Sequence, residues 1–169
     1  MIFIVLGTQK FQLNRLLKIV DDYVAEGKIQ EEVFAQRGNS DYVPKNYKSV
    51  SFLEKQEFDG MIQKADIVIT HSGVGSIITA LNSKKPVIVF PRLKKYKEHV
   101  DDHQLDIARA FAKKNFVLCC NDGEELADYI KESREKVFSE YTSQRKRTVE
   151  IIQNFLTEQC GNREGKEHG

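Results

Sequence analysis

The chain contains 169 residues, of which 30% are charged and 40% hydrophobic, a mixture typical of a globular protein and not of a disordered chain. The formal net charge of +1 argues against general nucleic-acid binding, because that function usually requires a strong basic excess. This length predicts a single domain over residues 1–158, followed by a flexible polar tail at 159–169.

Strand and helix patterns alternate along the chain. The strands are short apolar runs, and the helices repeat apolar residues every three or four positions. We predict strands at Ile2–Leu6, Gln30–Gln36, Tyr47–Leu53, Asp66–Thr70, Pro86–Phe90 and Phe116–Cys120. We predict helices from about Phe11 to Gly27 and at Glu54–Ala65, Gly75–Ser83, Glu98–Lys114 and about 122–158.

About six alternations of strand and helix predict an α/β fold: a Rossmann-like parallel sheet with helices on both faces. Right-handed crossovers place the carboxyl ends of all strands at one edge of such a sheet. Ligands bind at that edge, near the point where the strand order reverses. The turns that follow the strands are therefore the expected places for functional residues.

Features of the sequence that report on location favour a cytoplasmic protein. No apolar run approaches the length of a membrane span, and Met1–Leu6 lacks the basic start and cleavage site of a signal peptide. The three cysteines, Cys119, Cys120 and Cys160, form neither a metal-binding spacing nor an even disulfide framework. A reducing compartment is the expectation.

The run His71–Ser76 joins a buried strand to the start of a helix. A helix start carries unpaired N–H groups and the positive end of the helix dipole, so it can hold a phosphate or diphosphate. Gly73 and Gly75 would let the backbone approach a bulky ligand, and Ser72 and Ser76 can donate hydroxyls. A protonated His71 would oppose charge on a leaving group. The alternative is a tight turn with a helix cap.

Gly7, Thr8 and Gln9 follow the first strand. They form neither a dinucleotide-binding fingerprint nor a Walker loop, and an ordinary strand-to-helix turn is the alternative. Their expected place at the same edge as His71–Ser76 favours a functional role.

The run Glu98–Gln104 holds two histidines and three carboxylates. His99 and His103 have the i, i+4 spacing of a metal pair, but the glutamate of the H-E-x-x-H motif is missing and we expect no metal. Polar contacts to a sugar or ribose are favoured, and a solvated helix start is the alternative.

Basic residues precede this run: Arg92, Lys94, Lys95 and Lys97. A solvated loop is the preferred interpretation for each of them. Together they, and Arg145, Lys146 and Arg147, could instead face an anionic membrane surface or steer an anionic sugar nucleotide.

The long C-terminal helix is expected to begin at a cap, Asn121 or Asp122, and to turn Val137 and Phe138 inward. Its outer part, Val149–Leu156, has an apolar face with little domain left to cover it, which suggests a protein partner. The alternative is a helix that folds back on its own sheet.

Three motifs in order resemble the C-terminal half of family 28 glycosyltransferases: Thr70–Ser76, the proline-started strand, and Asp102-His103-Gln104 at a helix start. The resemblance covers roughly residues 1–130. The small subunits of split transferases are the most similar, both those of dolichol-linked UDP-N-acetylglucosamine transfer and those of bacterial capsule or exopolysaccharide β-1,4-galactosyl transfer. For the second group the run Pro91–Gln104 is especially similar.

The resemblance implies the UDP-sugar-binding half of a two-domain, B-type glycosyltransferase. It places Gly7–Gln9 at the interdomain cleft, Ser72–Ser76 around the diphosphate, and His103 and Gln104 at the donor sugar. One departure is Thr79, which stands where the peptidoglycan transferase of the family has a ribose-binding Glu. Glu98 or Asp102 could take over that contact.

The same resemblance implies an inverting hexosyltransferase that uses a UDP-sugar, galactose favoured, and a lipid-linked saccharide acceptor. A membrane-anchored subunit would supply the acceptor-binding half and hold this chain at the inner face of the cell membrane. No cofactor or metal is expected, because helix amides and hydroxyls can stabilise the leaving UDP. The general base stays unassigned. The alternatives are a non-catalytic accessory subunit and an independent sugar-nucleotide enzyme.

Overall fold

The computed structural model describes residues 1–120, 126–142, 152–154 and 157. Its strands are β1 (Ile2–Val5), β2 (Val33–Gln36), β3 (Lys48–Val50), β4 (Ile67–Thr70), β5 (Val87–Val89) and β6 (Leu118–Cys119). Its helices are α1 (Asn14–Ala25), α2 (Lys55–Lys64), α3 (Val74–Asn82), α4 (His103–Lys113) and α5 (Leu126–Glu135), with a short 3₁₀ helix at Lys94–Tyr96.

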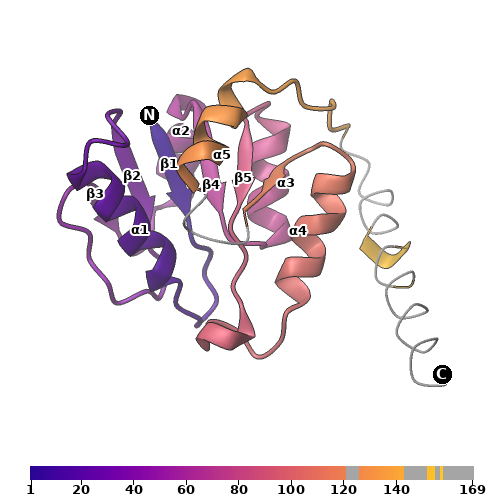
Figure 1. Cartoon of the computed structure of the whole chain (residues 1–169), viewed down its shortest axis with the longest axis horizontal. Coiled ribbons are helices and arrows are strands. Elements are labelled where there is room, and N and C mark those ends of the chain that lie inside the picture. Colours follow the sequence, from indigo (N-terminus) through magenta and orange to yellow (C-terminus); the bar gives the residue numbers. More distant parts are fainter. Residues whose placement is uncertain (121–125, 143–151, 155–156, 158–169) are drawn as a thin grey trace.

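The strands of the described residues form one parallel sheet in the order β3-β2-β1-β4-β5-β6 (Figure 1). The order reverses between β1 and β4, where Val5 pairs with Thr70. The expected Rossmann-like α/β fold is confirmed. The loops that follow β1 and β4 therefore start side by side, at the place where such sheets bind ligands.

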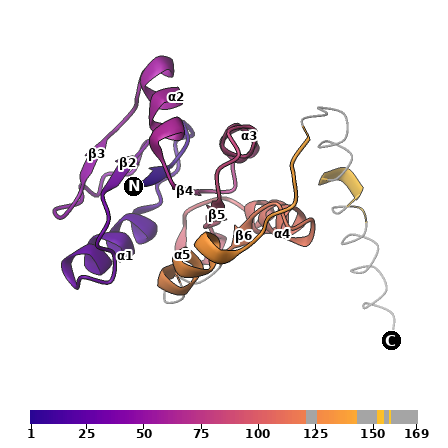
Figure 2. The same ribbon diagram turned by 90° about the horizontal axis from the view of Figure 1, so that it is seen from above.

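Helices cover both faces of the sheet, as Figure 2 shows. Successive residues of β1 point to opposite faces, so Ile4 belongs to one buried cluster and Phe3 to the other. The first cluster includes Leu17 of α1 and Ile130 of α5, and the second includes residues of α2, α3 and α4. Burial on both faces explains why the strands read as continuous apolar runs.

The helix predicted at Glu98–Lys114 is wrong at its amino end, because α4 begins only at His103. The preceding residues form the 3₁₀ helix and a turn in which Lys97 has a φ of 57°. The sequence pattern failed here because Glu98 is drawn into a long-range ion pair instead of a helical turn.

The single long helix predicted at 122–158 is also wrong, because α5 ends at Glu135 and residues 136–142 have no regular structure. Phe138 packs against the first cluster and Tyr141 against the second, so the segment passes from one face of the sheet to the other. Val137, predicted to point inward, is 87% exposed. The cap at 121–122 and most of the outer part at 149–156 lie outside the described residues; Ile152 packs against the second cluster.

No helix among the described residues is both long enough and apolar enough to cross a bilayer.

Candidate functional site

The candidate site lies at the carboxyl edge of the sheet. β4 lies between β1 and β5, and Thr70 of β4 is in register with Val5 on one side and Val89 on the other. The segments that follow these three strands therefore leave the sheet next to one another. The structure thus brings together Gly7 and the run His71–Ser76, as predicted from the sequence.

The imidazole of His71 is buried between two of the predicted glycines. A Cβ atom added at Gly7 would lie 2.5 Å from Cε1 of His71, and one added at Gly73 would collide with Nε2 of the same ring. Gly75 differs, since nothing lies within 4 Å of the place its Cβ would take. Gly7 and Gly73 thus make room for His71, and Gly75 alone leaves open space for a ligand.

The environment of His71 keeps its ring neutral. Burial, and then the nearby cation of Arg92, lower the pKa of His71 to about 4, against an opposing contact with the carbonyl oxygen of Val5. Its Nδ1 lies 3.4 Å from that oxygen. Protonation of His71, on which its predicted role in stabilising the leaving group depends, is therefore disfavoured at neutral pH in the free chain.

The amino end of α3 has the features of an anion site. No side chain caps this helix, and the first intrahelical bond runs from the amide of Ile77 to the carbonyl of Gly73. The amides of the preceding turn are the ones that a helix leaves without an intrahelical acceptor. Ser72 is buried and its Oγ has no hydrogen-bond partner, whereas Ser76 is half-buried.

Three buried side-chain polar atoms lack a hydrogen-bond partner in the described part of the chain: Nε of Arg37, Oγ of Ser72 and Nη1 of Arg92. Each belongs to the segment that follows a strand, β2, β4 or β5 respectively. Buried polar groups are normally paired, so these three atoms mark an edge where water or a polar ligand would complete the bonding.

Arg92 is buried, which corrects the prediction of a solvated loop residue. Burial lowers the pKa of Arg92 to about 10, against the favourable charge of Glu98, so the side chain stays cationic at neutral pH. Its Nη2 donates to the carbonyl of Phe11 at 3.0 Å. The sequence signal was weak: an arginine directly after a proline that follows a predicted buried strand. Lys94, Lys95 and Lys97 are exposed, as predicted, and Arg145–Arg147 lie outside the described residues.

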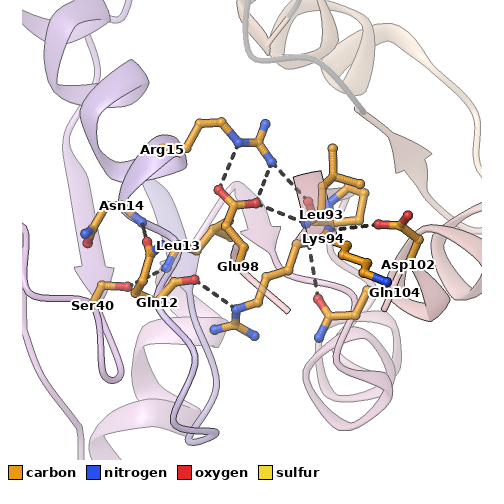
Figure 3. Close-up of polar contacts among 12 residues, drawn as sticks. Gln12, Leu13, Asn14, Arg15, Ser40, Leu93, Lys94, Glu98, Asp102 and Gln104 are labelled. Carbon is orange, nitrogen blue, oxygen red and sulfur yellow. Dashed lines mark hydrogen bonds and ion pairs between the residues drawn. The ribbon is translucent and has the colours of Figure 1, made fainter. Parts of the chain in front are cut away.

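Glu98 pairs with Arg15 (Figure 3). Nε and Nη2 of Arg15 donate to the two carboxylate oxygens, each at 2.9 Å, and the amide of Leu93 donates to Oε2 at 3.0 Å. Glu98 is 1% exposed. The prediction that Glu98 contacts a ligand is therefore wrong, because its oxygens are already occupied. Arg15 was not predicted as a site residue, because its position at the start of α1 carries no motif.

The other residues of this run lie in three different settings. Gln104 is buried and its Oε1 accepts from the amide of Arg92 at 3.3 Å, whereas the side chain of His103 is 68% exposed. His99 precedes α4, and its ring lies 4.5 Å from the ring of Phe11. The expected i, i+4 spacing of His99 and His103 on one helix is therefore wrong. Among the described residues no group of three or more metal-ligating side chains comes together.

Thr8 and Gln9 are exposed, and their carbonyl oxygens accept from Nδ2 of Asn39 at 3.2 and 2.9 Å. Thr79 stands where the peptidoglycan transferase of the family has a ribose-binding Glu. Its hydroxyl donates to the carbonyl of Gly75 at 2.8 Å. Asp102 is exposed and one of its carboxylate oxygens accepts from the amide of Lys94 at 2.9 Å. Thr8, Gln9 and Asp102 thus keep accessible surface near the edge.

A cavity of about 370 Å³ opens at the opposite edge of the sheet, where Pro86 and Phe116 precede β5 and β6. None of the predicted site residues lines it. The chemistry-bearing residues therefore lie at the carboxyl edge, and this cavity is a separate feature.

Comparison with protein families matches residues 1–158 to the glycosyltransferase family 28 C-terminal domain. Among relatives, the UDP-N-acetylglucosamine transferase subunit ALG13 of Candida albicans is 35% identical over 81 residues, which cover 48% of this chain and 26% of the relative. The human protein of the same name is 29% identical over 128 residues, covering 70% of this chain and 11% of its own length. This chain thus spans well under half of these relatives.

Solved structures show the same fold at low sequence identity. An NMR solution structure of ALG13 superposes with a TM-score of 0.58 at 19% identity, covering 89% of this chain and 94% of that one. The crystal structure of MurG from Acinetobacter baumannii gives a TM-score of 0.52 at 15% identity, over 91% of this chain and 49% of that one. The six-stranded sheet therefore corresponds to the C-terminal half of B-type glycosyltransferases. By the family match, this chain belongs to the glycosyltransferase family 28 C-terminal domain family.

Proposed function

We propose that this member of the glycosyltransferase family 28 C-terminal domain family is the donor-binding subunit of a two-component inverting glycosyltransferase. It binds a UDP-sugar, and a membrane-anchored partner binds the lipid-linked saccharide that receives the hexose. The observation that carries the proposal is the concentration of unpaired buried polar atoms at the carboxyl edge, next to the uncapped amino end of α3. The names of the relatives, which are UDP-sugar transferase subunits, support the same donor class.

The donor diphosphate binds at the start of α3. The amides of the first turn and the hydroxyls of Ser72 and Ser76 donate to its oxygens, and open space beside Gly75 admits it. The buried cation of Arg92 adds a favourable field, since charge interactions are stronger away from water. We expect these groups to supply the stabilisation that a metal ion gives in other transferases, so no cofactor is required.

The acceptor hydroxyl attacks the anomeric carbon from the face opposite the diphosphate, which inverts that centre. Negative charge grows on the leaving UDP, next to the helix dipole. A neutral His71 fills the space beside Gly7 and Gly73 and does not supply positive charge. The general base comes from the partner, which also carries the acceptor.

Galactose is the proposed hexose, and synthesis of a capsule or exopolysaccharide is the proposed setting. Both rest on the resemblance of Pro91–Gln104 to the galactosyl-transferring small subunits. The named relatives are N-acetylglucosamine transferases, so a donor panel must include that sugar. Competition of UDP-galactose, UDP-glucose and UDP-N-acetylglucosamine for the isolated chain, by calorimetry, ranks the donors directly.

The test of donor binding compares two glycines that both face open space in a helix, Gly75 in α3 and Gly60 in α2. We expect Gly75→Val to abolish binding of UDP-galactose and Gly60→Val to leave it unchanged. Ser72→Ala should weaken binding. If the chain binds no UDP-sugar, and Ser72→Ala with Gly75→Val leaves transfer by the complex intact, the proposal is wrong.

A non-catalytic accessory subunit is the second candidate. The exposed apolar side chains of Tyr96 and Val100, which lie beside the exposed lysines of the same loop, favour a partner at this edge in either case. Transfer assayed with and without the membrane subunit separates the two functions. An accessory subunit predicts that the membrane subunit alone retains transfer, whereas a donor-binding subunit predicts that both chains are required.

A further inference from the structure

Two loops of the carboxyl edge meet although their strands are not neighbours. One follows β1 and leads into α1, and the other follows β5 and leads into α4; β4 lies between the two strands. Contacts between these loops therefore pass across the end of β4, where His71 and Ser72 leave the sheet. The sheet joins β1 to β5 only through β4, and the side chains of Arg15 and Arg92 connect the two loops directly.

The Arg15–Glu98 pair makes the central contact between them. The two parallel hydrogen bonds of 2.9 Å fix the orientation of both planar groups. The guanidinium lies between two aromatic rings, with its Cζ 4.3 Å from the centre of Phe90 and 4.5 Å from that of Tyr96. Nη2 also donates to the carbonyl of Pro91 at 3.2 Å. One side chain of α1 thus contacts the β5 loop at several points.

Contacts from the same loop lead to the donor site. Glu98 accepts from the amide of Leu93, and the adjacent Arg92 donates from its own amide to Gln104 at the start of α4 (Figure 3). The guanidinium of Arg92 reaches back to the carbonyl of Phe11 at 3.0 Å. The position of Arg92, whose charge acts on His71, therefore depends on how the two loops are held together.

Fold stability does not account for this arrangement. Replacing a buried ion pair by apolar residues of similar volume is often neutral or stabilising, because removal of two charges from water is costly. The sheet and its two apolar clusters already support the fold. A specific geometry is what a bidentate pair adds, since Arg and carboxylate match in only a few orientations.

We propose that Arg15 and Glu98 are positioning residues that fix the β1 and β5 loops across the end of β4 and so hold Arg92 and Gln104 in place for a nucleoside diphosphate. This inference rests on the proposed function, because the ligand is the donor assigned above. Neither residue touches the donor. They act through Leu93, Pro91 and Arg92.

The test uses the full chain with UDP as the probe. Arg15→Lys keeps the positive charge but loses the planar guanidinium group that makes two parallel hydrogen bonds. The matched control is Arg134→Lys, because Arg134 also pairs with a carboxylate, that of Glu31, at the opposite edge of the sheet. We expect Arg15→Lys to weaken UDP binding about tenfold or more at a temperature where it is fully folded. Arg134→Lys should bind UDP as the parent does. Glu98→Gln, which retains an acceptor for the amide of Leu93, should give a smaller loss than Arg15→Lys.

Amide hydrogen exchange provides a readout that needs no ligand. In Arg15→Lys we expect exchange at Leu93 and Lys94 to rise about tenfold, while Ile4 in β1 stays protected as in the parent. A merely structural role would accelerate exchange throughout, lower the melting temperature and leave the UDP affinity of the folded fraction unchanged. That result would overturn the proposal.

The two hypotheses fail in different ways. If the parent chain does not bind UDP, the proposed function fails and the positioning of a donor fails with it. If the parent binds UDP and Arg15→Lys binds it within twofold of the parent, only the positioning role is overturned.

Discussion

Helix α1 contributes to two buried polar regions that differ in how fully their groups are paired. In the loop region, Asp21 holds residues 41–47: it accepts from the hydroxyl of Tyr42 at 2.6 Å and from the amides of Lys45 and Asn46 at 2.9 and 2.8 Å. In the edge region, at the carboxyl ends of β1, β4 and β5, Ser72 Oγ and Arg92 Nη1 have no partner.

The difference indicates what each region is for. Burial alone would raise the pKa of Asp21, but hydrogen bonds from Tyr42, Lys45 and Asn46 outweigh it and hold that pKa below its usual range. A carboxylate whose hydrogen bonds are all satisfied has a structural role, because a ligand could bind it only by displacing existing partners. Unused donors beside a helix start are typical of a binding site. Changes made in the two regions should therefore separate stability from binding.

The largest expected effect is in the edge region. Glu98→Ala leaves the charge of Arg15 without its carboxylate and the amide of Leu93 without its acceptor, which should cost about 3–5 kcal/mol in the free energy of unfolding. Urea unfolding measures it. The double variant Arg15→Met with Glu98→Met is the control and should recover most of that stability while UDP binding stays weak. A loss below about 1 kcal/mol for Glu98→Ala would contradict the pairing.

Acid should weaken the two regions in separate pH windows. The folded pKa of His71 is about 4 and its unfolded value is 6.5, so the unfolded chain binds this proton first. Stability should fall by about 3 kcal/mol as the pH drops from about 6.5 to about 4. The pKa of Asp21 in the folded chain lies below its ordinary value of 3.8, so its contribution is lost only below that pH. Unfolding curves at several pH values test this.

The controls for the pH prediction are one variant from each region. His71→Gln should flatten the slope between pH 6.5 and 4, and Asp21→Asn should leave that slope unchanged. A parent chain whose stability does not change over that interval would mean that His71 is protonated in the folded state.

Removing the carboxylate of the loop region should affect stability alone. Asp21→Ala leaves the donors of Tyr42, Lys45 and Asn46 without their acceptor, at a cost of about 2–3 kcal/mol. The dissociation constant for UDP, measured on the folded variant, should equal that of the parent. A marked loss of affinity would show that the loop region supports the donor site, so that the two regions do not separate stability from binding.

The smallest effects come from two glycines of the edge region. Gly73→Ala places a methyl group against the ring of His71 and should cost about 1–2 kcal/mol, whereas Gly75→Ala meets open space and should change stability by less than about 0.5 kcal/mol. Thermal unfolding compares the pair. UDP affinity adds a second comparison, since a methyl at Gly75 enters the proposed ligand space. Equal stability losses would contradict the placement of His71.

Much of the fold could be predicted because buried segments have a recognisable local pattern of apolar residues. The apolar runs of β1, β4 and β5 reflect coverage on both faces, and the alternation of strand and helix sets the parallel arrangement. The contact between the Gly7 turn and His71–Ser76 followed from the rule that strand ends share an edge. These predictions needed no knowledge of which side chains pair.

The sequence by itself thus determined the layered sheet, the edge at which chemistry gathers and the helix start beside Gly75. Only the tertiary structure decided that Arg92 is buried, that Glu98 is occupied by Arg15 and that His71 fills the space between Gly7 and Gly73. The physical reason is the sequence separation between the residues that determine each feature. Hydrophobic periodicity is encoded over a few residues, whereas the partner of a charged side chain lies wherever the folded chain returns, here 83 residues away.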